Sequence, residues 1–208
     1  MTRVKVCGIT TDEDLETAVE AGADAVGIVA DVSTDTPRAV QPDRAVELSR
    51  AAPPFVTTVL VTMPGQPDRA VDLAGRVQPD VVQVHGDLTP GDLAYLSANV
   101  SGDVMRAVTP DEAPAHDTVA DGLVVDSLDE SGAGGTGETH DWERSRELVE
   151  SLSSPVVLAG GLTPDNVAEA VETVRPFAVD VASGVEADPG RKDPEAVAAF
   201  VRAAGGRP

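Results

Sequence analysis

Cys7 and Asp126 are the two residues of this chain whose types and positions best suit acid–base chemistry. Each ends a short apolar, β-branched run, Val4 to Cys7 in one case and Leu123 to Asp126 in the other. A lone thiol can be an inert apolar group, and an aspartate after a strand can simply cap a loop. Together, however, they offer a base and an acid for proton transfer at two substrate positions. We interpret them as a candidate catalytic pair.

Lys5 shares the Cys7 side of the first apolar run, because side chains two apart in a strand point the same way. A lysine inside a protein needs a partner, so we expect Lys5 to meet a carboxylate. A thiol of ordinary pKa, near ~8.5, is a poor base at neutral pH. We therefore expect the pKa of Cys7 to be lowered, with the charge of Lys5 as the cause.

Glycines late in the chain indicate a phosphate site. Gly160 and Gly161 follow one apolar run, and Ser183 and Gly184 follow the next. Glycines let backbone N–H groups approach a phosphate closely, without lysine or arginine. The alternative is that they only make tight turns. An earlier run containing Gly135 is either another close-approach turn or a lid over the site, and the sequence does not separate the two.

Arg38 and His85 are further candidates for substrate binding. Arg38 could hold a carboxylate with two bonds, or it could balance nearby surface acid. His85 titrates near neutrality, and a structural role is as good an interpretation as a catalytic one. The other histidines, His116 and His140, have no partner at metal-ligand spacing. We predict no metal and no cofactor.

The elements that must position these residues alternate between β-branched runs and helical periodicity along the whole chain, which is typical of repeated βα units. Eight runs are expected as strands: Arg3 to Cys7, Ala25 to Val29, Phe55 to Val61, Val81 to Val84, Val104 to Val108, Gly122 to Asp126, Val156 to Ala159 and Phe177 to Val181. Eight strands predict an α/β fold, a single-domain (β/α)₈ TIM barrel over residues 1–208. An open doubly wound sheet is the alternative, but it would place its glycine-rich turn after the first strand. In a barrel, residues at the strand ends share one active-site face.

Helix signals between these runs are of uneven strength. Thr10 with Glu13 resembles a capping box, and Thr163 before Pro164 resembles an N-cap. Pro110 and Pro114 leave room for only a short or degenerate fifth helix.

Composition limits the partners of the protein. The 208 residues carry 36 acidic and 15 basic side chains, a formal net charge of -21. Such a surface repels nucleic acids and anionic membranes. Only two lysines occur and the acid is dispersed, as in proteins of halophiles, although an acidic protein of another origin is the alternative. One cysteine, no long apolar run and no charged leader at the N-terminus favour a reducing cytoplasm. No helix shows an unusually wide apolar stripe, so we expect a monomer.

The order of these motifs resembles the phosphoribosylanthranilate isomerase family over residues 3 to 186. The resemblance is carried by Lys5 to Thr10, Thr36 to Arg38, Gln83 to Gly86, Val125 to Ser127, Gly134 to Gly137 before Asp141-Trp142, Ala159 to Asn166, and Asp180 to Glu186. It implies an Amadori rearrangement of N-(5′-phosphoribosyl)anthranilate to the 1-deoxyribulose 5-phosphate derivative. The second strand, Gly27 to Ala30, departs from the family in lacking aromatic residues.

The resemblance also implies a role for each residue. Asp126 would be the general acid that protonates the furanose ring oxygen, and Cys7 the base that removes the C2′ proton. Arg38 would bind the anthranilate carboxylate, and backbone around Gly161, Ser183 and Gly184 would hold the phosphate. The substrate-binding set is completed by Lys5, His85, Gly135, Gly160 and Asp180.

Other readings of the sequence remain open. Indoleglycerol phosphate synthase and the aminoaldose isomerase of histidine synthesis share late phosphate loops, but the first would need more lysines, and the second usually has aspartate where Cys7 stands. A phosphate-binding sensor without catalysis would make the pairing of Cys7 and Asp126 a coincidence.

Overall fold

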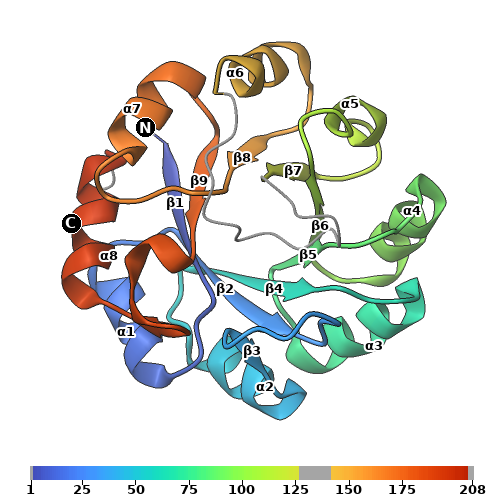
Figure 1. Cartoon of the computed structure of the whole chain (residues 1–208). Coiled ribbons are helices and arrows are strands. Elements are labelled where there is room, and N and C mark those ends of the chain that lie inside the picture. Colours follow the sequence, from blue (N-terminus) through green and yellow to red (C-terminus); the bar gives the residue numbers. More distant parts are fainter. Residues whose placement is uncertain (1, 127–141, 206–208) are drawn as a thin grey trace.

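The structure is a computed structural model that describes residues 2–126 and 142–205. In that part of the chain, eight parallel strands close into a barrel surrounded by helices (Figure 1). The barrel closes because β1 pairs with β2 on one side and with β9 on the other. The predicted (β/α)₈ barrel is therefore confirmed.

The barrel strands follow one another around the ring in chain order. They are β1 (Arg3–Cys7), β2 (Ala25–Ala30), β4 (Thr57–Thr62), β5 (Val81–Val84), β6 (Asp103–Val108), β7 (Gly122–Val125), β8 (Val156–Leu158) and β9 (Ala178–Val181). A two-residue strand, β3 (Ala39–Val40), adds to the edge of β2. After β9, the 3₁₀ helix η1 (Ser183–Val185) leads into a small antiparallel hairpin of β10 (Glu186–Asp188) and β11 (Arg191–Lys192). Each predicted strand is present, with ends shifted by two residues at most.

The surrounding helices are α1 (Asp12–Glu20), α2 (Pro42–Ala51), α3 (Pro67–Val77), α4 (Pro90–Asn99), α5 (Ala113–His116), α6 (Trp142–Ser151), α7 (Val167–Val174) and α8 (Pro194–Ala203). The four-residue α5 confirms the degenerate fifth helix. No helix among the described residues is long and apolar enough to cross a membrane.

Two predicted helix starts are wrong. The capping box of α1 is formed by Thr11 and Asp14, one residue later than expected, because the Thr10 hydroxyl donates to the carbonyl of Gly190 instead. Helix α7 begins only after Asn166, because the Asn166 side chain accepts from the N–H of Thr163 and so folds the segment before the helix into a turn.

Strand residues alternate between two cores. Val4 and Val6 are fully buried in the cluster between the barrel and the helices, whereas Cys7 packs against Val29 and Val61 in the barrel interior. This two-residue period is what the first strand predicts, and it places Lys5 inside the barrel with Cys7.

The amino ends of the strands are joined by aspartates. Asp24, Asp80 and Asp121 each stand immediately before a strand and accept a hydrogen bond from a backbone N–H of the preceding strand in the ring. The donors are Val4, Thr58 and Val104, at distances of 2.7–2.8 Å. These bonds tie successive strands together at the face away from the pocket described below.

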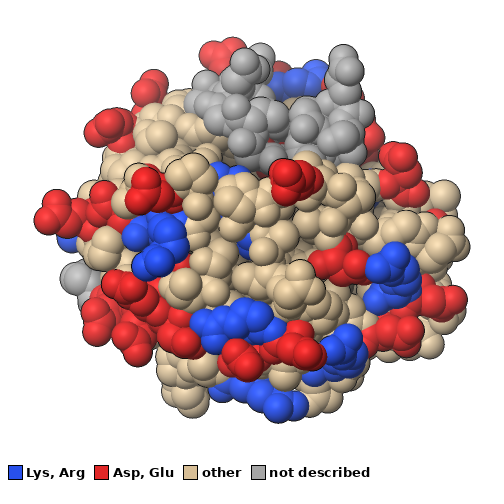
Figure 2. All heavy atoms as spheres, turned by 60° about the horizontal axis from the view of Figure 1, so that its bottom comes forward, with Lys and Arg blue, Asp and Glu red and all other residues tan. Residues whose placement is uncertain are grey.

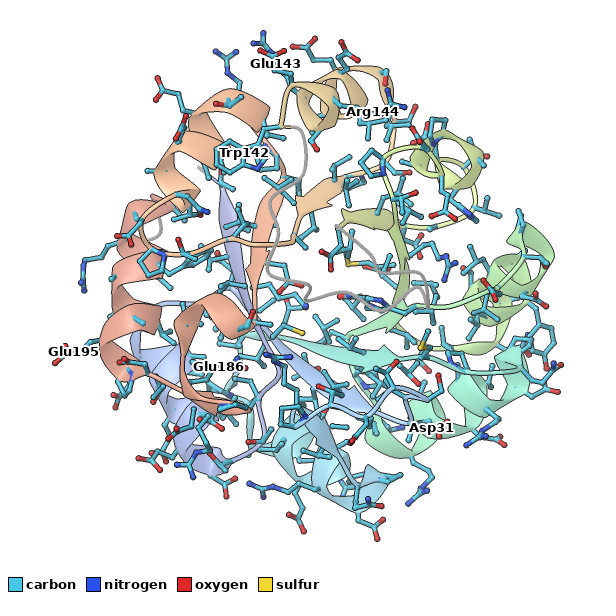
Figure 3. The ribbon with its side chains drawn as sticks, viewed as in Figure 1. Asp31, Trp142, Glu143, Arg144, Glu186 and Glu195 are labelled. Atoms are coloured by element: carbon cyan, nitrogen blue, oxygen red, sulfur yellow. The ribbon has the colours of Figure 1, made fainter. Side chains whose placement is uncertain are left out.

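The surface carries the dispersed acid that the composition indicates. Figure 2 shows acidic side chains scattered around the visible face, with Lys and Arg side chains among them. Glu143 and Glu195 extend outwards from α6 and α8 in Figure 3. Several arginines pair with these acids at the surface, as Arg44 does with Asp12.

Candidate active site

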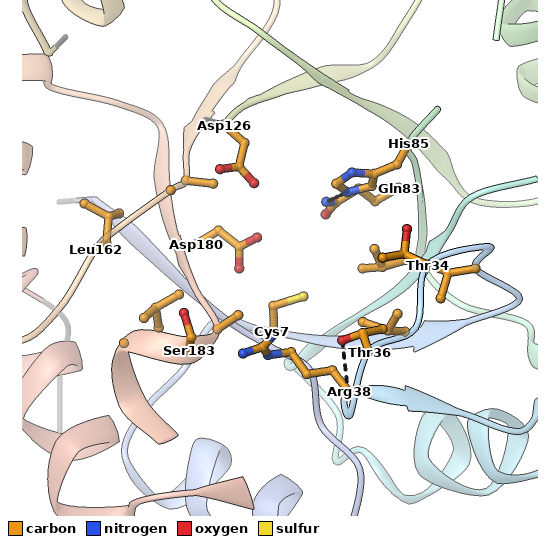
Figure 4. Close-up of a pocket in the computed structure, with 18 of the residues that line it drawn as sticks. Cys7, Thr34, Thr36, Arg38, Gln83, His85, Asp126, Leu162, Asp180 and Ser183 are labelled. Carbon is orange, nitrogen blue, oxygen red and sulfur yellow. Dashed lines mark hydrogen bonds between the residues drawn. The ribbon is translucent and has the colours of Figure 1, made fainter. Parts of the chain in front are cut away.

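A cavity of about 150 Å³ opens at the carboxyl ends of the barrel strands (Figure 4). It contains nine of the residues that the sequence predicts for the site: Cys7, Arg38, His85, Asp126, Gly160, Gly161, Asp180, Ser183 and Gly184. The structure thus brings together residues that are up to 177 positions apart in the chain. Gly135 lies outside the described residues.

Lys5 does not line this cavity but lies in the barrel beneath it. Its Nζ donates to Asp180 Oδ2 at 2.7 Å, and the two residues are neighbours in the register of β1 and β9. The predicted carboxylate partner is therefore confirmed as Asp180. Burial alone lowers the pKa of Lys5, but the charges of Asp180 and Cys7 outweigh it, so that the pKa is raised and the ammonium form is held.

The expected lowering of the Cys7 pKa is wrong: the structure raises it. The residue is only 8% exposed, and burial, which penalises the thiolate, has the largest influence on this pKa. Lys5 acts in the expected direction, but Asp180 opposes it. Because the lysine is already paired with a carboxylate, its charge offsets only part of the burial.

Gly27 makes the room that Cys7 occupies. It is the register neighbour of Cys7 on β2, and a Cβ at Gly27 would lie 2.7 Å from Cys7 Sγ and 3.1 Å from Lys5 Nζ. Both distances are shorter than comfortable contacts. The sequence shows Gly27 only as a departure from the aromatic pattern, and the structure gives it a physical reason.

Asp126 enters the cavity from the opposite wall. It directly follows β7, its backbone N–H donates to the carbonyl of Val108, and its side chain is 7% exposed. In Figure 4 its carboxylate points into the cavity, across from the side chains of Gln83 and His85.

His85 is held by Gln83, whose Nε2 lies 2.9 Å from His85 Nε2. Gln83 lines the cavity and was not singled out from the sequence. The signal was present, because Gln83 is two residues before His85 and therefore faces the same side of β5. The contact gives His85 a fixed orientation next to the cavity.

Arg38 makes a two-pronged ion pair with a carboxylate of the protein itself. Its Nε and Nη2 donate to the two oxygens of Glu186 at 2.8 and 2.9 Å. Its backbone N–H donates to the Thr36 hydroxyl, as drawn in Figure 4. The bonds to Glu186 use Nε and Nη2, which leaves Nη1 of this cavity-lining residue for a further acceptor.

Glu186, the last residue of the motif Asp180 to Glu186, is the main functional residue to which the sequence assigns no role. It is labelled in Figure 3 on the segment after β9, and its side chain is 6% exposed. Burial raises the pKa of its carboxyl, but the bonds from Arg38 and the charge of Lys192 lower it more strongly, so the pKa lies below its ordinary value. Glu186 is therefore an anion that fixes Arg38 in place.

The late glycines are required by the backbone. Gly160 and Gly161 have φ values of +86° and +62°, in the left-handed region. A Cβ at Gly184 would lie 1.9 Å from the carbonyl oxygen of Leu162, so no other residue fits there without moving the chain. These glycines bring the loops after β8 and β9 together at one side of the cavity.

A barrel with an acid and a base at its carboxyl face and glycine loops beside them defines the class, an acid–base enzyme of the (β/α)₈-barrel type. A family model described as N-(5'phosphoribosyl)anthranilate (PRA) isomerase matches residues 4–203. This chain belongs to that family, and it is an isomerase of tryptophan biosynthesis.

Relatives in other organisms agree with this assignment. The N-(5'-phosphoribosyl)anthranilate isomerase of Natronomonas pharaonis is 64% identical over 99% of both chains, and that of Halorubrum lacusprofundi is 56% identical over 99% of this chain and 97% of the relative. Both come from halophilic archaea, in agreement with the acidic composition. Phosphoribosyl anthranilate isomerase from Thermotoga maritima has a similar structure, with a TM-score of 0.84, 36% identity and 99% coverage of both chains.

Another solved structure of the family contains a ligand. It is a phosphoribosyl anthranilate isomerase in complex with reduced 1-(o-carboxyphenylamino)-1-deoxyribulose 5-phosphate, with a TM-score of 0.82, 34% identity and 99% coverage of both chains.

Proposed function

We propose that this chain catalyses the Amadori rearrangement of N-(5′-phosphoribosyl)anthranilate to 1-(2-carboxyphenylamino)-1-deoxyribulose 5-phosphate, with Asp126 as general acid and Cys7 as general base. The observation that carries the proposal is that both groups open onto one cavity, beside a cation and the glycine loops. The ligand of the related structure is a reduced form of this product.

Asp126 protonates the ring oxygen of the ribose, and the ring opens to a Schiff base. Cys7 then removes the C2′ proton to give an enolamine, which tautomerises to the ketone. Both steps move protons only, so the reaction needs no redox cofactor. Lys5 and Lys192 favour the thiolate of Cys7, against the effect of burial.

Two anchors hold the substrate between these groups. Arg38, fixed by Glu186, binds the anthranilate carboxylate through its remaining amino group. The loops of Gly160, Gly161, Ser183 and Gly184 bind the phosphate through backbone N–H groups. Apolar wall residues such as Val61 and Met63 take the place of aromatic contacts to the anthranilate ring. Anchoring both ends makes the proton transfers effectively intramolecular.

The protein is further proposed to act as a monomer in the cytoplasm. Among the described residues, the groups required for binding and catalysis all come from one chain. Sedimentation of the native protein in molar salt measures the mass directly, and a mass of twice 21.3 kDa would contradict the proposal.

The experiment is the loss of phosphoribosylanthranilate fluorescence in molar salt, for the wild type, Cys7→Ala and Asp126→Asn. We expect kcat to fall by about 10²–10⁴ in each variant, the range of general acid–base catalysis. Binding of inorganic phosphate and the melting temperature serve as controls for folding. Full activity in Cys7→Ala would overturn the assigned base, and a wild type that binds phosphate without turnover would indicate a sensor.

A further inference from the structure

Lys192 is one of the two lysines of the chain, and the mechanism above gives it no contact with substrate. Its side chain is completely buried, although it does not line the cavity. Its Nζ donates to Glu186 Oε1 at 3.0 Å and to the carbonyl oxygen of Ala182 at 3.0 Å. Burying an ammonium group costs free energy unless charge pairing and hydrogen bonds compensate for it. These two contacts are the compensation that Lys192 has.

The contact with Ala182 determines the orientation of a peptide group. The described chain contains no cis peptide bonds, so the carbonyl of Ala182 and the N–H of Ser183 point in opposite directions. Lys192, which does not line the cavity, holds the carbonyl on its own side. The N–H of Ser183 must then point away from Lys192, and Ser183 lines the cavity.

A flipped peptide would have the opposite effect. It would present the carbonyl oxygen of Ala182 to the cavity, and a carbonyl dipole repels a phosphate dianion. Ala182 has φ -123° and ψ -84°, outside the regular helix and strand regions, so no helix or strand ladder holds this peptide in its orientation. The bond from Lys192 therefore opposes the flip at the residue where it would matter.

The contact with Glu186 adds a charge effect. The Glu186 carboxylate also forms an ion pair with Arg38, so two cations share one anion. The cluster of Arg38, Glu186 and Lys192 therefore carries a net positive charge. Without Lys192, Arg38 and Glu186 would cancel. The backbone N–H of Lys192 donates to Asp14 Oδ1, which fixes the hairpin against α1 and keeps the ammonium in register with both partners.

We propose that Lys192 is a positioning residue for phosphate: by holding the Ala182 carbonyl it orients the Ser183 N–H towards the substrate phosphate, and by sharing Glu186 it keeps the surrounding cluster cationic. The proposal rests on the proposed function in naming the phosphate as that of the substrate. It extends that function by assigning the buried lysine that acts through the loop.

The test compares Lys192→Met with wild type in the same molar salt, using inorganic phosphate as the probe. Methionine keeps an unbranched apolar side chain that is only one heavy atom shorter, and it removes the donors. We expect phosphate to bind at least about tenfold more weakly, and KM for phosphoribosylanthranilate to rise by a similar factor. The change in kcat should be smaller, because Cys7 and Asp126 keep their positions and Lys5, which favours the Cys7 thiolate more strongly than Lys192 does, is retained. The matched control is Arg191→Met, which loses the same charge one residue earlier, from an exposed side chain paired with Glu13. It should bind phosphate as the wild type does.

A second readout separates orientation from general stability. The amide resonance of Ser183 should shift when phosphate is added to the wild type and to Arg191→Met, and it should not shift in Lys192→Met at the same concentration. If Lys192→Met does not fold, Lys192→Arg takes its place, and its phosphate affinity should lie measurably below that of the wild type.

The outcomes distinguish this inference from the proposed function. A folded Lys192 variant with wild-type phosphate affinity, or a wild type that turns over substrate without binding phosphate, overturns the role of Lys192. A wild type that binds phosphate in a Lys192-dependent way but shows no turnover leaves this role in place and overturns the isomerase reaction.

Discussion

Aspartates at the two ends of the barrel do opposite things. At the amino ends, Asp24, Asp80 and Asp121 accept backbone N–H groups from neighbouring strands and so consolidate the sheet. At the carboxyl ends, Asp126 and Asp180 face the cavity, one as the proposed acid and the other as the partner of Lys5. The end of the barrel at which an aspartate lies, amino or carboxyl, separates a stabilising carboxylate from one in the site.

The largest effect on activity should come from Gly27→Ala, which adds one methyl group next to Cys7 in the barrel interior. The new Cβ would lie 2.7 Å from Cys7 Sγ, so the thiol or the strand must move. We expect kcat/KM to fall by about 100-fold, since small displacements of a catalytic group have effects of that size.

The matched control for this change is Gly75→Ala in α3, where a Cβ would have nothing within 4 Å. Its activity should equal that of the wild type. Unchanged kcat/KM in Gly27→Ala, measured on folded protein, would show that Cys7 does not need its present position.

Asp80→Ala tests whether the aspartates at the amino ends of the strands stabilise the barrel. Asp80 Oδ2 accepts both the backbone N–H and the hydroxyl of Thr58, and alanine leaves both donors without this acceptor. We expect the free energy of unfolding to fall by about 2 kcal/mol, with kcat/KM nearly unchanged at temperatures where the protein is folded. Denaturation in urea at fixed salt gives the first quantity.

Asp103→Ala is the comparison for that experiment, because Asp103 is an exposed aspartate at the same end of the barrel. It should lose much less stability. Equal losses in the two variants would mean that net charge, rather than the bond to Thr58, determines the effect.

The sequence predicts the strands and the site better than it predicts side-chain pairings and helix starts. Strand order, the inward side of β1 and most of the cavity residues follow from a period of two and from the rule that barrel sites lie at strand ends, whereas Asp180 was expected only from the family resemblance. The carboxylate of Asp180 could be expected near Lys5 only in general terms, because the pairing depends on the register of β1 against β9. Helix starts failed where tertiary contacts, such as Thr10 with Gly190, competed with local capping.

The pKa of Cys7 shows a further limit of sequence reasoning. The sequence shows that a lysine is near Cys7. It does not show how deeply Cys7 is buried, or that Lys5 is already paired with Asp180. The sequence also gives no role to Glu186 and Lys192, because their roles depend on tertiary contacts. The hairpin after β9 brings Lys192 to Glu186, and Glu186 in turn pairs with Arg38.

The pH dependence of Cys7 follows from the raised pKa. A raised thiol pKa means that the thiolate appears only above the ordinary range of a cysteine, so the rate of alkylation by iodoacetamide should rise about tenfold per pH unit without levelling off near neutrality. The value of kcat/KM should follow the same rise if Cys7 is the base. The same thiol in the urea-unfolded chain is the control, and it should level off at lower pH. A plateau near pH 7 in the folded protein would contradict the raised pKa.

Phe55→Gly should have the smallest effect on stability. It tests whether Phe55, at the amino ends of the barrel strands, is exposed to solvent or covered by another chain. Phe55 lies in the loop before β4, with a fully exposed side chain and φ +74°. Glycine relieves a left-handed strain of about 1–2 kcal/mol and costs about 0.5–1 kcal/mol in backbone entropy, so stability should rise by about 0.5 kcal/mol. Thermal unfolding in molar salt measures this as an increase of about 1–2 °C. A decrease would show that Phe55 is covered in solution, which would argue against the monomer, because a residue exposed in the single chain loses no contacts when it becomes glycine.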